Sequence, residues 1–251
     1  MASKQVTDRG RSSSQVVATV ETNAAEVNRK LRGLLERHLQ SGEAMPDFAL
    51  FVTLIARHLT SAADLLNAAD LVHESEIGDD VQPRVERDEA ETDLRDSAIN
   101  YRNAISVGYG DAAARAHGVG SAAPPDPRGL VRYAKDFHAG LIDPKRSPAT
   151  PTRGGVVVDR AVIARELAPR IARLDAALES VDREAAELKL TQTAKDNAVA
   201  ANDTAFSGVA NAMEGLLILA GRRDLAARVR PSARRPGIVD EEVDADPIAK
   251  T

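Results

Sequence analysis

The sequence predicts an all-α protein. We expect an elongated four-helix bundle made of two long helical hairpins, with an added N-terminal helix and a Pro-rich connector that carries one short helix. Aromatic residues are only 3% of the chain and Trp is absent, so the core must depend on Leu, Ile, Val and Ala. Ala is the strongest helix former. Apolar residues also recur three and four positions apart over long stretches, which indicates amphipathic helices.

The first segment, residues 1–20, is polar and Ser-rich, and we expect a flexible arm there. Residues 21–117 are expected to hold an N-terminal helix and the first hairpin. The N-terminal helix is predicted over about 22–40, and Asn23 with Glu26 three residues later resembles a capping box at its start. Its apolar stripe is Ala24, Val27, Leu31, Leu34 and His38.

The first hairpin is predicted from about Pro46 to His117. Its first helix begins near Pro46, is broken around 77–80, and is followed by a second helix from near Pro83. The stripe expected to face the core in the first of these helices is Phe48, Phe51, Ile55, Leu59, Ala62, Leu66, Ala69 and Val72.

Residues 118–157 form a Pro/Gly-rich connector. Asp126-Pro127 is expected to start one short helix there, because Asp is a good N-cap and Pro is well placed in a first turn. That helix would carry Leu130, Val131, Ala134 and Phe137. The run 156–158, three valines, is the one plausible strand in the sequence.

Residues 158–230 are predicted to form the second hairpin, with Asp159 as the cap of its first helix and Pro169 inside that helix. No Gly or Pro separates the two helices of this hairpin, so its turn must be tight and lie near 188–193. The alternative is one helix of about 60 residues.

The two hairpins are similar enough to suggest an internal duplication. Ile55-Ala56-Arg57 matches Ile171-Ala172-Arg173, for example, with an offset that centres on about 110 residues. Any two Ala/Arg-rich hairpins look alike, however, so the similarity has a second explanation that needs no duplication. The four helices are predicted either way.

The sequence offers little catalytic or metal-binding chemistry. Cys is absent, none of the five histidines follows a Glu by three positions, and no G-x-S-x-G or phosphate-binding loop is found. We therefore expect no catalytic residue, no metal and no cofactor. The sequence favours a protein that is not an enzyme. The net charge of −5 argues against a nucleic-acid surface along the whole chain.

The C-terminal tail, residues 231–251, is first basic and then acidic. A cluster of arginines that begins just before it is the candidate site for docking a partner: Arg222, Arg223, Arg228, Arg230, Arg234 and Arg235. The same arginines could bind phosphates, complement a helix C-terminus, or belong to a disordered solubilising tail.

The function that the sequence favours is that of a non-enzymatic structural or protein-interaction protein. It would act through self-assembly as a homo-oligomer or by docking to a protein partner. One alternative is a nucleic-acid-associated protein that uses the arginine cluster, and another is a small-ligand binder or enzyme with a pocket between helices. The apolar runs are too short to predict a membrane span, and we expect a bacterial, cytoplasmic protein.

Overall fold

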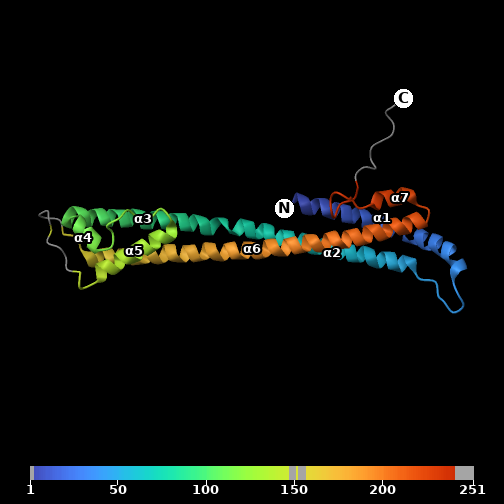
Figure 1. Cartoon of the computed structure of the whole chain (residues 1–251), viewed down its shortest axis with the longest axis horizontal. Helices are drawn as coiled ribbons and strands as arrows, with labels where there is room; N and C mark the ends of the chain where they lie inside the picture. Colours follow the sequence, from blue (N-terminus) through green and yellow to red (C-terminus); the bar gives the residue numbers. More distant parts are fainter. Residues whose placement is uncertain (1–2, 147–150, 152–156, 241–251) are drawn as a thin grey trace, which may run out of the picture. The chain divides into compact units, whose positions relative to one another are not determined.

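The structure, a computed structural model, describes residues 3–146, 151 and 157–240 (Figure 1). The all-α prediction is confirmed, since helices make up nearly all of the regular structure in these residues. The one β feature among them is an isolated antiparallel bridge between Pro231 and Val239. The elements are α1 (Lys4–Leu35), a 3₁₀ helix (Glu36–His38), α2 (Phe48–Asp79), α3 (Val81–Tyr109), α4 (Asp111–Ala116), α5 (Pro127–Ile142), α6 (Arg160–Leu219) and α7 (Arg223–Val229).

The chain forms two compact units. The first unit comprises Met1–Ser75 and Lys189–Thr251, and the second comprises Glu76–Leu188. The helix α6 contributes residues to both units, and each unit has a hydrophobic core of its own.

The core of the first unit lies between α1, α2, the C-terminal part of α6, and α7. Phe206 and Met213 of α6 are fully buried there, together with Leu59 of α2 and Val20 of α1. Figure 1 shows α1 (blue) and α7 (red) beside this part of α6, and Arg222, which directly precedes α7, donates to Glu26 of α1 at 2.7 Å. The unit is therefore a helical bundle rather than a single hairpin.

The predicted flexible arm over residues 1–20 is wrong for the part that the structure describes. The helix α1 begins at Lys4, and the expected capping box at Asn23 lies inside it. Val6, Val16 and Val20 are buried, and the small side chains of Ser12 and Ser13 are buried between them. A Ser-rich sequence can pack closely against a neighbouring helix, which composition alone did not reveal.

The core of the second unit lies between α3, α4, α5 and the N-terminal part of α6. Phe137 of α5 is fully buried in it, with Leu94 of α3 and Leu167 of α6. The short helix predicted in the connector is confirmed as α5. Its N-cap is Asp126, whose carboxylate accepts from the backbone N–H of Gly129 at 2.6 Å.

The turn predicted near 188–193 is wrong, and the alternative of one long helix is what the structure has. The helix α6 runs without a break through 60 residues and includes Pro169, and Asp159 caps it by accepting from Ala161 and Val162. The segment expected to turn is rich in Leu, Lys and Gln, which favour helix, and it contains no residue that would end one.

The predicted first hairpin also lacks a reversing turn at residues 77–80, where its first helix was expected to end. Only Asp80 lies between α2 and α3, and its backbone is itself right-handed helical at φ −67° and ψ −15°. The break expected over 77–80 is therefore one residue long.

The duplication of the two hairpins stays a prediction. The predicted valine strand is wrong for the two of its three residues that the structure describes, because Val157 and Val158 are not in a strand, and Val156 lies outside the described residues.

The start of the C-terminal tail, residues 231–240, folds back onto the first unit. Ser232 N–H donates to the carbonyl of Ile238 at 2.8 Å, and Val239 N–H donates to Ser12 Oγ of α1 at 3.3 Å. Val239 is buried in the core of that unit. This stretch is therefore part of the fold, while the acidic stretch that follows Asp240 lies outside the described residues.

A buried asparagine in α6 leads to a first prediction. Asn202 is fully buried, and neither its Nδ2 nor its Oδ1 has a hydrogen-bond partner among the described residues. Replacing it with a residue of similar volume removes the desolvation cost of the amide, so we expect Asn202→Leu to stabilise the protein by about 1–3 kcal/mol. Urea denaturation of both proteins measures this, and a destabilised variant would show that the amide has a partner such as a bound water.

Candidate functional site

The helix α2 has one face in the core of the first unit and an opposite, outer face that is apolar and exposed. Leu59 and Leu66 of the inner face are buried, as predicted. On the outer face, large side chains keep about half of their surface in solvent: Leu50 53%, Phe51 48%, Leu54 51%, Leu65 66%, Leu71 49% and Val72 55%. Phe51 and Val72 were predicted to face the core, and that assignment is wrong.

An open apolar groove lies beside this outer face, between α2 and α6 of the first unit. Its volume is 670 Å³. Ile55 and His58 of α2 line one side, and small residues of α6 line the other: Ala200, Ala201, Thr204, Ala205, Gly208, Val209 and Ala212. The small side chains of α6 leave room for a bulky group, and a Cβ added at Gly208 would meet nothing within 4 Å.

The apolar character of α2 also gives the helical run Phe48–Tyr109 a membrane-like stretch. By length and composition alone this run is long and apolar enough to cross a bilayer, and most of its apolar stretch is not buried in the structure. A helix that carries apolar residues on two faces passes this test whether or not it meets lipid.

The six predicted docking arginines do not form one free patch. Arg222 is held by Glu26 at 2.7 Å and by Asp224 at 2.9 Å, and Arg230 Nε donates to Glu214 at 2.8 Å. Arg222 also lowers the pKa of Asp224 to about 2. The remaining four have exposed side chains: Arg223, Arg228, Arg234 and Arg235.

A buried ion pair fixes the register between α2 and α6. Lys195 Nζ lies 2.6 Å from Asp70 Oδ1, and the backbone N–H of Ser3 donates to Asp70 Oδ2 at 2.7 Å. Burial acts to raise the pKa of Asp70, but the hydrogen bonds from Lys195 and Ser3 outweigh it and hold that pKa below its usual value. One turn further along α2, His73 Nδ1 lies 3.1 Å from Thr191 Oγ1.

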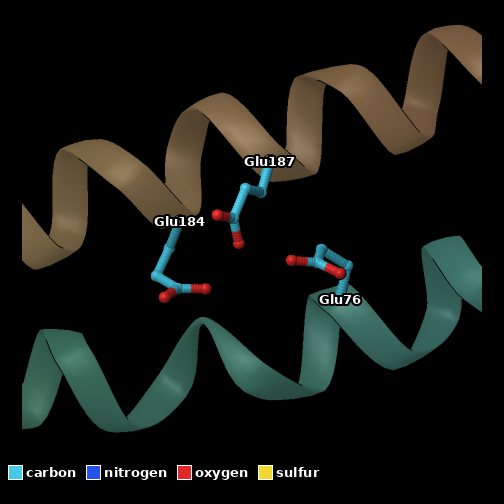
Figure 2. Close-up of side chains that lie close together, drawn as sticks. All are labelled: Glu76, Glu184 and Glu187. Carbon is cyan, nitrogen blue, oxygen red and sulfur yellow. The ribbon is translucent and has the colours of Figure 1, made fainter.

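Three carboxylates gather in the second unit, where α2 and α6 lie side by side. Glu184 and Glu187 project from α6 toward Glu76 of α2 (Figure 2), and the three offer oxygen atoms within 4.8 Å of one another. Oxygen ligands of this kind suit Mg²⁺ or Ca²⁺. All three side chains are partly or fully exposed, and exposed acidic groups also gather in this way without an ion. Sequence reasoning missed the cluster because Glu76 is distant from the other two in the chain.

The crowding of these carboxylates gives a prediction about pH. Burial, followed by repulsion from Glu187, Asp79 and Glu184, raises the pKa of Glu76. A carboxyl whose pKa is raised by folding binds its proton more tightly in the folded state, so the protein loses stability as the pH rises above 4.5 and through the folded pKa.

We therefore expect Glu76→Gln to raise the thermal midpoint at pH 8 and to leave it nearly unchanged at pH 4. Circular dichroism melts at both pH values measure this. Glu21→Gln, an exposed change on α1, is the control and should not move the midpoint. A lower midpoint for Glu76→Gln at pH 8 would contradict the repulsion.

The chain matches no family model, no curated protein and no solved structure.

Proposed function

We propose that the protein is a non-enzymatic structural or protein-interaction protein, and that the outer face of α2 in the first unit docks an α-helix of another protein chain. The observation that carries this proposal is the row of half-exposed leucines beside an open apolar groove. Monomeric soluble proteins rarely leave contiguous apolar surface of this kind uncovered, and such patches mark interaction sites.

The shape and chemistry of the groove favour a helix over a small substrate. Among the residues that line it, only His58 and Thr204 carry polar groups in their side chains. A catalytic pocket needs several convergent polar groups, whereas a helix-binding groove needs apolar walls and room for large side chains. Recognition of an amphipathic helix in a groove therefore fits better than catalysis.

The arginine cluster supports the nucleic-acid alternative less well. Two of its members, Arg222 and Arg230, already neutralise carboxylates of the first unit. A phosphate would have to compete with these carboxylates, and no aromatic side chain stands in the cluster for base stacking.

The test is a double substitution on the outer face. Leu54→Glu and Leu65→Glu each replace a leucine that the partner would cover by a charged side chain. Burying one leucine side chain stabilises a contact by about 1.5–3 kcal/mol. We therefore expect the dissociation constant to rise by about 100-fold or more. The chain purified natively from its own cells should elute above its monomer mass of 26.7 kDa in high salt, and the variant should elute as the monomer.

Val107→Glu is the matched control, because Val107 is also aliphatic and half exposed but lies on α3 in the second unit. It should leave the assembly intact. A wild-type chain that elutes as a monomer from its own cells at every concentration would overturn the proposed function.

A further inference from the structure

The outer face of α2 has the seven-residue repeat of a coiled-coil seam. Two sets of exposed residues alternate along it, with members seven apart in each set and the second set offset by three. They are Phe51, His58, Leu65 and Val72 in the first set, and Leu54, Ser61 and Ala68 in the second. A 3.5-residue spacing of this kind is what two helices need to pack against each other along their length. The inner face of α2 has its partners inside the unit, so this seam is a second one without a partner among the described residues.

Two opposite charges flank this seam on the same side. Arg57 and Asp64 are seven residues apart, both are exposed, and neither has an ion pair with a described residue. In a parallel pair of α2 helices each of them would lie beside an uncharged position. In an antiparallel pair, residues that precede the first set face one another across the seam, so Arg57 of each copy meets Asp64 of the other. The same placement brings Leu50 beside Leu71 of the other copy.

The groove lies at the level where such a pair would have its centre. Asp70 contacts Lys195, and His73, further along α2, contacts Thr191, which comes earlier in α6, so the two helices run antiparallel here. The residue nine positions before Asp70, Ser61, is therefore level with the residue nine positions after Lys195, Thr204. Thr204 lines the groove, and so does His58 one turn from Ser61. The exposed small residues of α6 thus flank the middle of the α2 seam, where a second bundle can approach closely.

We infer that the partner of the outer α2 face is a second copy of this chain, related by a twofold axis that passes near Thr60. This inference rests on the proposed function and names its partner. The two α2 helices pack antiparallel, the pair is closed by two reciprocal Arg57–Asp64 ion pairs, and the apolar groove of each copy is covered by the other. A twofold contact of one surface with itself is the commonest form of protein dimer.

Single cysteines test the direction and register of the pair, because the chain has no cysteine of its own. With the axis near Thr60, the two copies of position 61 would lie about 3 Å apart along the helices, whereas the two copies of position 68 would lie about 24 Å apart. We therefore expect a short bismaleimide to cross-link purified Ser61→Cys chains into dimers and to leave Ala68→Cys chains unlinked. Both sites are exposed and belong to the same set of the repeat, so each serves as the control for the other. Equal cross-linking at both sites would overturn the antiparallel pair.

Charge reversal tests the ion pairs. Arg57→Asp and Asp64→Arg each place like charges opposite one another, and we expect each to raise the dimer dissociation constant by about three-fold or more. The double variant restores opposite charges and should return to within about two-fold of the wild type. No recovery in the double variant would overturn the reciprocal pairing.

The two proposals fail in different ways. In the first case, the purified chain is a monomer with no cross-link at position 61, but the chain from its own cells stays in an assembly that Leu54→Glu and Leu65→Glu disrupt. This result would show that the partner is not a second copy, and the proposal that the outer face of α2 docks a protein would stand. If a monomer instead pellets with phosphatidylcholine vesicles and the same two substitutions abolish this, the face binds lipid and both proposals are wrong.

Discussion

Asp70→Ala should destabilise the protein by about 3–5 kcal/mol, because removing one member of a buried ion pair leaves the other charge buried and unpaired. Asp70 is fully buried, and the side chain of its partner Lys195 is only 11% exposed. The substitution also leaves the backbone N–H of Ser3 without its acceptor. Urea denaturation followed by circular dichroism measures the loss.

Two further proteins make this measurement specific. Asp96→Ala removes an exposed carboxylate on α3 and should change the stability by less than about 0.5 kcal/mol. The double variant Asp70→Leu with Lys195→Met replaces both charges by apolar groups and should recover most of the loss. If the double variant is as unstable as Asp70→Ala, unpaired charge is not the cause.

The same carboxylate gives a pH dependence with a definite sign. Because the pKa of Asp70 is lower in the folded state than its usual 3.8, its contribution is present above pH 3.8 and disappears as the pH falls through the folded pKa. Wild-type stability should therefore fall more steeply below pH 4 than that of Asp70→Ala. Parallel acid denaturation curves for the two proteins would contradict the lowered pKa.

Phe137→Ala is expected to have the second large effect, a loss of about 3–5 kcal/mol from the cavity that it leaves. Phe137 is fully buried where α5 meets α3 and α6 in the second unit. The control is Ile142→Ala, at the end of the same helix, where the side chain is 59% exposed. That change should cost less than about 0.5 kcal/mol.

Hydrogen exchange shows which helices lose stability in the Phe137→Ala variant. Each unit has its own buried cluster, so we expect Phe137→Ala to speed exchange first in α3, α5 and the first half of α6. Equally faster exchange in α1 and α7 would show that the two buried clusters unfold together and would contradict separate cores.

The parts of the fold that sequence reasoning predicted well are those with a local signal. The helix α5 was predicted because Asp126 and Pro127 form a cap and a first turn, and both its position and its buried face are confirmed. Asp159 was also predicted as a helix cap, and it accepts from the backbone N–H of Ala161 at the start of α6. Such signals lie within a few residues of one another and do not depend on tertiary packing.

The errors arose where the outcome depends on packing between distant segments. Ser12 and Ser13 were assigned to a flexible arm, but both are buried. The sequence of a serine does not indicate burial, because burial depends on whether a neighbouring helix covers it. The helix α6 was expected to turn, although its residues near 190 favour helix, because a hairpin is the usual way to bury two such apolar seams.

The candidate site could not be read from the sequence, because α2 carries apolar residues on two faces. A single stripe through Phe51, Leu59 and Val72 satisfied the helical period, but it joined residues of the inner and outer faces. Only the position of α1 and α6 decides which of the two faces is covered. The arginine cluster stood out instead, since clustered charge is visible in a sequence and exposure is not.

Light scattering on the purified wild-type chain in high salt decides whether the outer face of α2 binds a second copy of the chain. An apolar contact along α2 persists when surface charges are screened. The mass should therefore be twice the 26.7 kDa of the chain, about 53 kDa, and should fall to 26.7 kDa when Leu54 and Leu65 are both replaced by Glu. A wild-type mass of 26.7 kDa at every concentration would contradict an assembly of two copies through the outer face of α2.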